Sequence, residues 1–255
     1  MNTLAPKQNI KLLKMMKEAF DQERLRPSYR PVLDVRNPGR KSFILGCDLE
    51  TTTGKIIPYS KLHRLARMTD TSRELDRWLI QHGLQALREL HRQQSDARLF
   101  IPQSGAALAN REYPRWLERQ KALADTSSQG LIVAFRLSQI SRDLHQAHHC
   151  IQALHHAQVE TMIEGFSDHP AALKVLRAMN SRYVSLSSAL QEGEDGIIEH
   201  RMQECHRLGA KILLPDIHSA EAVNLNWAGG ADLLAGDYIQ PARPTLDFSF
   251  SPAVA

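Results

Sequence analysis

The side chains best suited to metal or acid–base chemistry gather in one histidine-rich stretch, residues 145–156. His145 and His149 are four residues apart, which places both on one face of a helix. Imidazole nitrogens are common ligands of transition metals. However, the apolar residues of the same stretch form its buried stripe, and Asp143 is the only nearby carboxylate. We therefore expect an exposed, pH-sensitive helix face here rather than a metal centre.

Nucleophilic catalysis has no support in the sequence. Ser104, Ser185 and Ser187 have no histidine and aspartate partners at a known triad spacing. The segment 136–143 contains arginines that could stand at the end of a strand. A polar loop in which Ser141 is the N-cap of the next helix also explains this segment, and we expect the loop.

Composition limits the class of protein. The chain has 255 residues, of which 42% are hydrophobic, and this length suits a single α/β barrel. The net charge of +4 favours at most an anionic small ligand and is too small to indicate nucleic-acid binding.

Cysteine usage and the N-terminal segment predict a cytoplasmic protein. Cys47, Cys150 and Cys205 are too far apart for a disulfide framework or a paired zinc site. The first residues lack the apolar core and cleavage site of a signal peptide. No stretch approaches the length of a membrane span.

Apolar periodicity predicts strands that alternate with helices, which is typical of a parallel sheet closed into a barrel of eight strands. A helix over 8–25, ended by Pro27, and a hairpin of 29–35 with 43–49 precede this alternation. We expect one domain, residues 1–255, with its core at about 8–250. The later strands are 98–101, 130–135, 159–163, 183–186, 211–214 and 233–234, and the helices are 75–92, 113–124, 140–156, 170–179, 196–208 and 220–228.

Several segments carry a more specific pattern. Tyr29-Arg30-Pro31-Val32 opens a strand, Leu75-Asp76-Arg77-Trp78-Leu79-Ile80 lies in a helix, and Gly209-Ala210-Lys211-Ile212-Leu213 precedes the last strands. Together they resemble the EAL domain family, whose barrel hydrolyses or senses cyclic di-GMP. The ending, residues 246–250, further resembles the FimX-like branch, which regulates type IV pili. The resemblance implies a TIM-like (β/α) barrel of the EAL type with an N-terminal helix and an initial β-hairpin.

The departures from the family are concentrated at its polar positions. If Gly54 lies on the family's turn, Ile44 replaces a metal-binding Glu and Asp48 replaces a nucleotide-binding Arg. Glu164-Gly165 stands for the first two residues of Asp-Asp-Phe-Gly, so at most one acid is kept. Hydrolysis with two metal ions needs several converging oxygen ligands, so we expect no phosphodiesterase activity. The other altered positions are Pro102, Ala134, Ser185, Ser187, Pro215 and Ala235.

We therefore expect a catalytically inactive regulatory scaffold or adaptor, acting through protein contacts in bacterial cyclic di-GMP signalling, with type IV pilus or motility control as the process. The alternative is a non-hydrolytic receptor for cyclic di-GMP or another anionic nucleotide, and a third is an enzyme of altered chemistry. The candidate ligand contacts are Arg30, Pro31, Leu45 and Glu164, with no metal or cofactor. Because Asp48 would repel an anion, we expect cyclic di-GMP affinity weaker than about micromolar.

Two segments are candidate partner surfaces. The N-terminal helix carries Leu12 and Met15 outside its main apolar stripe. In the tail, Leu246, Phe248 and Phe250 alternate with polar residues, as in a strand added to the edge of a partner's sheet. The other explanation is that both segments pack on their own barrel.

Overall fold

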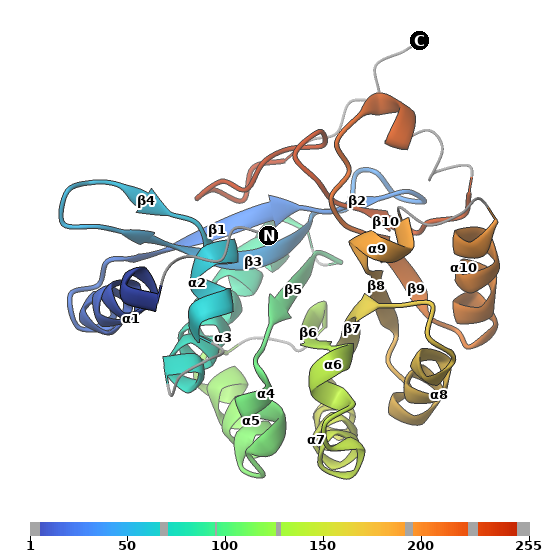
Figure 1. Cartoon of the computed structure of the whole chain (residues 1–255), viewed down its shortest axis with the longest axis horizontal. Helices are drawn as coiled ribbons and strands as arrows, with labels where there is room; N and C mark the ends of the chain where they lie inside the picture. The colour runs from blue at the N-terminus through green and yellow to red at the C-terminus, as the bar shows by residue number, and fades with distance from the viewer. Residues whose placement is uncertain are drawn as a thin grey trace.

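The computed structural model describes residues 6–66, 71–94, 96–125, 129–191, 196–223 and 229–248, without the side chains of 6–13 and 63–66 (Figure 1). The strands are β1 (Leu25–Pro31), β2 (Leu33–Asp34), β3 (Ser42–Glu50), β4 (Ile56–Ile57), β5 (Arg98–Pro102), β6 (Leu131–Arg136), β7 (Glu160–Phe166), β8 (Tyr183–Leu186), β9 (Lys211–Leu214) and β10 (Leu233–Leu234). The helices are α1 (Pro6–Asp21), α2 (Tyr59–Ala66), α3 (Thr71–Gln93), α4 (Gly105–Ala109), α5 (Tyr113–Leu123), α6 (Leu137–Ile140), α7 (Leu144–His156), α8 (Pro170–Met179), α9 (Ser188–Gln191) and α10 (Ile197–Arg207).

The sheet closes into a barrel. Its strands follow the order β1-β3-β5-β6-β7-β8-β9-β10-β2. Neighbours from β3 to β10 are parallel, whereas β1 pairs antiparallel with β3 and β2 pairs antiparallel with β10. Because only Val32 separates β1 from β2, the two ends of this order are one run of chain. The predicted barrel with its initial hairpin is confirmed.

The strands bury side chains on both sides of the sheet. Successive residues of a strand point to opposite faces, so Ile132 and Ala134 of β6 face the inside of the barrel while Val133 and Phe135 face the helices. A barrel of this kind has a packed interior rather than a pore. The interior cluster consists of Val32, Phe100, Ile132, Ala134, Met162, Tyr183, Leu213, Leu233 and Ala235, with Ile44 packed against it.

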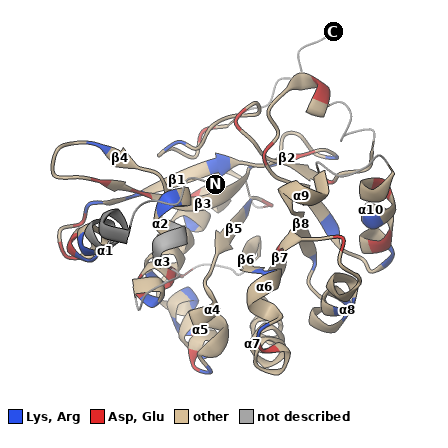
Figure 2. Cartoon of the chain, in the orientation of Figure 1, with Lys and Arg blue, Asp and Glu red and all other residues tan. Residues whose placement is uncertain are grey.

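Helices cover the outside of the sheet, with α3, α5, α7, α8 and α10 arranged around it (Figure 1). α3 buries the side predicted from its periodicity, including Leu75, Leu79 and Leu87. Among the described residues, no helix is long and apolar enough to cross a membrane. Where the outer helices are described, acidic and basic residues are mixed over them (Figure 2).

The first helix ends earlier than its sequence suggests. α1 stops at Asp21, and Glu23 takes a left-handed conformation with φ of 51°. Pro27 therefore does not end a helix; it lies inside β1, opposite Cys47. Proline fits there because β3 is the one described strand that pairs with β1 along this part, so the missing N–H leaves no ladder position empty.

The helix predicted over 140–156 is two helices. α6 ends at Ile140, with Ser141 as its C-terminal cap, and α7 begins at Leu144. The N-cap of α7 is Asp143, whose carboxylate accepts the Gln146 N–H at 2.9 Å. The prediction of Ser141 as this N-cap was wrong, because Asp143 is the acceptor placed directly before the first helical turn.

Both candidate partner segments contact their own barrel. Arg243 and Tyr29 exchange two backbone hydrogen bonds, so the tail pairs with the edge of β1. Leu246 and Phe248 pack, partly buried, against the core, and Met15 of α1 does the same. Phe250 and the side chain of Leu12 lie outside the described residues.

Candidate functional site

The candidate site is the mouth of the barrel, the end at which its parallel strands finish. Active sites of such barrels lie at this end. Side chains along each strand point alternately into the barrel and out toward the helices, so the last inward-facing residue of each strand lies at the mouth. On β6, Arg136 continues the inward-facing series of Ile132 and Ala134, and on β7, Glu164 continues that of Met162. The last inward-facing residues of the two strands are thus a cation and an acid.

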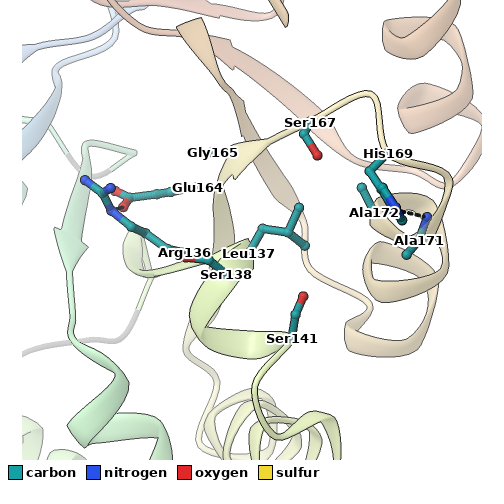
Figure 3. A pocket seen from close by; sticks show the side chains of 10 residues that line it. All are labelled: Arg136, Leu137, Ser138, Ser141, Glu164, Gly165, Ser167, His169, Ala171 and Ala172. Atoms are coloured by element: carbon teal, nitrogen blue, oxygen red, sulfur yellow. Dashed lines mark hydrogen bonds and ion pairs between the residues drawn. The ribbon is translucent and has the colours of Figure 1, made fainter. Parts of the chain in front are cut away.

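Arg136 and Glu164 are neighbours in the parallel register of β6 and β7. Their side chains point toward one another (Figure 3), with Arg136 Nε 3.8 Å from Glu164 Oε2. Both line a hollow of about 370 Å³, together with Ser138, Ser167 and His169. The hollow presents hydroxyl, imidazole and guanidinium donors, but Glu164, the one carboxylate among its described lining residues, already faces an arginine.

Gly165 shapes the strand end beside Glu164. The register between β7 and β8 shifts between Glu164 and Phe166, and Gly165 has φ of 65°. This left-handed conformation is disfavoured for residues with a Cβ. Glycine therefore permits a bulge at a position where the family pattern has an acid.

Arg30 forms the second ion pair of the mouth. It lies on β1, opposite Ile44 of β3. Its Nη1 donates to Asp237 Oδ1 at 2.6 Å, and the two side chains are 34% and 60% exposed. The guanidinium is thus within reach of solvent but already paired with a carboxylate.

The other predicted contacts are less accessible. Leu45 is fully buried in the outer core, where its Cδ2 approaches Gly83 of α3. Pro31 is buried and lies opposite Phe43. Both residues are thus withdrawn from solvent, whereas Arg30 and Glu164 present charged groups.

Apolar or small groups occupy the positions at which the resemblance to the EAL family implies polar residues. Ile44, Ala134 and Ala235 belong to or pack against the interior cluster. Pro102 ends β5 directly beside Ala134, and Pro215 follows the last residue of β9. The side chains at these positions thus offer no oxygen ligand.

Asp48 has a structural contact of its own. Its Oδ1 accepts the backbone N–H of Tyr59, the first residue of α2, at 3.0 Å and the Ser28 hydroxyl at 3.3 Å. A carboxylate at a helix start satisfies an N–H that has no partner within the helix. Asp48, at the position where the resemblance implies an arginine, therefore caps α2.

The donor set of the mouth does not fit a pair of divalent metal ions. Such ions bind several oxygen ligands, chiefly carboxylates. Of the described carboxylates at this end of the barrel, Glu164 and Asp237 each face an arginine, and Asp216, which follows β9, accepts the Ser188 hydroxyl at 3.3 Å. Among the described residues, no group of three or more His, Cys, Asp or Glu side chains could hold a metal ion.

The histidine-rich helix is an exposed face, as predicted. His145, His148 and His149 are exposed on α7, and the rings of His145 and His149 lie 4.6 Å apart. The sequence interpretation missed Asp237. The available signal was its position just after β10, since residues that follow barrel strands face the mouth.

Fold and mouth together define a (β/α) barrel of the EAL type. A model of the EAL domain matches residues 13–242, and the chain belongs to this family.

Solved structures with the same fold include the FimX EAL domain from Pseudomonas aeruginosa bound to c-di-GMP, with 19% identity, a TM-score of 0.85, and coverage of 94% of this chain and 99% of that chain. The PaMucR phosphodiesterase in its c-di-GMP complex has 16% identity, a TM-score of 0.84, and coverage of 92% and 98%. An uncharacterized 76.5 kDa protein in the phbC 3' region of Thiocystis violacea is 17% identical over 247 residues. That match spans 96% of this chain but 36% of the relative's length.

Proposed function

We propose that this EAL domain does not hydrolyse cyclic di-GMP and acts as a regulatory scaffold or adaptor in cyclic di-GMP signalling, with type IV pili or motility as the controlled process. The observation that carries the proposal is the mouth itself. Its inward-facing acid Glu164 and its acid Asp237 each face an arginine. Phosphodiester hydrolysis by two metal ions needs several carboxylates that are free to bind metal.

The fold by itself does not distinguish a hydrolytic EAL domain from a non-hydrolytic one. A phosphodiesterase and a FimX EAL domain have nearly the same TM-score against this chain. The side chains of the mouth therefore carry the argument for a non-hydrolytic role. An adaptor has to present a stable surface, and a barrel interior packed with apolar side chains supports one.

Hydrolysis is tested with purified protein, cyclic di-GMP, and magnesium or manganese. We expect no turnover above a control without protein. Turnover that Glu164→Ala abolishes would contradict the proposal. In the cell, Glu164→Ala should complement a deletion strain as well as the wild-type chain does, because an adaptor needs its surface rather than this carboxylate. Loss of complementation by a folded variant would point to a functional mouth.

The second candidate is a non-hydrolytic receptor for cyclic di-GMP or another anionic nucleotide. Two arginines at the mouth, Arg30 and Arg136, favour it, because guanidinium groups bind phosphate through paired hydrogen bonds. Calorimetric titration with cyclic di-GMP, with and without magnesium, separates the candidates. A one-site curve of sub-micromolar affinity would favour the receptor, whereas the adaptor predicts affinity weaker than about micromolar.

A further inference from the structure

A second polar hollow lies at the opposite end of the barrel, where the parallel strands begin. Its volume is about 600 Å³, and Arg40, Arg98 and Arg182 line it beside Glu160. Arg98 and Glu160 are the first residues of β5 and β7, and Arg182 directly precedes β8. Three arginines from separate segments therefore converge on one recess.

Only some of their N–H groups have protein acceptors. Arg98 Nη1 donates to Asp34 Oδ2 at 3.0 Å, and Arg40 Nη1 donates to the same oxygen at 2.6 Å. The other oxygen of Asp34 accepts the backbone N–H groups of Arg36 and Asn37. Asp34 is thus saturated. Within the described part of the chain, Arg98 Nε and Nη2 have no hydrogen-bond acceptor.

Arg182 and Lys211 add further cationic groups. Arg182 is 58% exposed and uses Nη1 for Glu160 Oε1, at 2.9 Å. Lys211 stands beside Tyr183 in the β8–β9 register and forms no ion pair with a described residue. Burial lowers the pKa of Lys211, and the guanidinium groups of Arg98 and Arg182 lower it further, against Asp34 and Asp232, which raise it. Repulsion between these cations would be relieved by a bound anion.

Acids limit the positive charge of the recess. Arg40 Nε pairs with Asp96 at 2.7 Å, and Glu160 also accepts from the Tyr183 hydroxyl at 3.4 Å. Both acids line the hollow. The positive side of the recess is therefore the part formed by Arg98 and Arg182, with Lys211 beside Tyr183 on the neighbouring strand. Glu160 is the carboxylate that pairs with Arg182.

We propose that this recess, at the amino-terminal end of the barrel, binds a small multiply charged phosphate such as a pyrophosphate or sugar-phosphate group, held by Arg98, Arg182 and Lys211. Guanidinium forks match the oxygens of phosphate, and the donors of Arg98 that lack an acceptor would find one there. The site is separate from the mouth, so it does not depend on what the mouth binds.

The shape of the recess favours a small ligand without a base. Tyr183 is fully buried, and its ring lies under the Arg98 guanidinium, 5.9 Å from Cζ. The ring therefore cannot stack on a nucleobase. A hollow of about 600 Å³ holds a small molecule rather than a macromolecular surface.

The test uses inorganic pyrophosphate as the probe, titrated by calorimetry at low ionic strength, where surface charge is least screened. The double variant Arg182→Gln/Lys211→Gln should bind about tenfold more weakly or worse, because it removes two charge-assisted contacts. The matched control is Lys174→Gln/Arg177→Gln, which removes two exposed charges from α8. Thermal unfolding establishes that both double variants are folded.

The variant Glu160→Gln should change pyrophosphate affinity in the opposite direction. Loss of the competing carboxylate should tighten pyrophosphate binding several-fold, because the Arg182 guanidinium becomes available to the ligand. Three outcomes would overturn the proposal: no binding to the wild-type chain at millimolar pyrophosphate, equal weakening in the control pair, or weaker binding by Glu160→Gln. Competition between cyclic di-GMP and pyrophosphate would also contradict it, because the two ends of the barrel are separate.

Discussion

Arg136 and Glu164 end the inward-facing rows of β6 and β7 directly opposite one another, with 3.8 Å between Nε and Oε2. Parallel pairing of the two strands produces this juxtaposition, since neither residue is close to the other in sequence. The pair has two consequences. Glu164 is engaged by a cation, and Arg136 is turned toward an acid that opposes the binding of anions.

Neutralising the acids of the mouth should favour anionic nucleotides. We expect Glu164→Gln and Asp237→Asn each to tighten cyclic di-GMP binding several-fold, because Arg136 and Arg30 lose their competing carboxylates. Calorimetric titration measures the change. Arg30→Gln and Arg136→Gln should weaken binding, and identical affinities for all four variants would mean that the nucleotide does not contact the mouth.

Asp48 should contribute to stability through α2. Asp48→Ala removes the acceptor of the Tyr59 N–H and should lower the free energy of unfolding by about 1 kcal/mol. Asp48→Asn keeps an acceptor oxygen and serves as the control, with a smaller loss. Urea denaturation measures both. A loss of similar size in the two variants would show that the cap is not the reason.

Asp76 should make stability depend on pH. This buried carboxyl of α3 accepts the Ser104 N–H at 2.9 Å and the Ser104 hydroxyl at 2.6 Å. Burial raises its pKa from 3.8 to about 7, and the hydrogen bonds from Ser104 oppose this only in part. The folded state therefore holds its proton more tightly than the unfolded state. Its stabilising contribution is complete below about pH 4 and is lost as pH rises through about 7, by up to roughly 4 kcal/mol.

Asp76→Asn isolates this effect. The variant cannot ionise, so its free energy of unfolding should rise relative to that of the wild-type chain between pH 5 and pH 8. Denaturation of both proteins across this window tests the expectation. A constant difference would mean that Asp76 does not titrate there.

The tail should stabilise the barrel that it covers. Deleting the chain from Pro241 removes two backbone hydrogen bonds between Arg243 and Tyr29 and exposes the core beneath Leu246 and Phe248. We expect a loss of about 2–4 kcal/mol in unfolding free energy with the fold retained. The substitutions Leu246→Ser and Phe248→Ser should each reproduce part of it, whereas Asp247→Ser, at an exposed position, should not. An unchanged midpoint after deletion would leave the tail available for a partner.

Much of this architecture follows from local pattern. Short apolar strands alternating with amphipathic helices predict the parallel barrel, and β5, β8 and β9 lie within a residue of their expected bounds. The predicted ends of helices were wrong where a single backbone conformation or capping contact sets the end. α1 ends at Asp21 rather than near Pro27, and α7 begins at Leu144 after its cap, Asp143. Such contacts involve only a few atoms, and the spacing of apolar residues in the sequence does not predict them.

Some features of the candidate site could likewise be predicted from the sequence, and others could not. The sequence by itself determined the barrel and the presence of Arg30 and Glu164, and its resemblance to the EAL family predicted the loss of acids at positions such as Ile44, Ala134 and Pro215. Only the tertiary structure decided that Arg30 pairs with Asp237, 207 residues away, and that Asp48 caps α2. The physical reason is that hydrophobic periodicity is a property of one segment, whereas the partner of a charged side chain depends on which strands the closed sheet brings together.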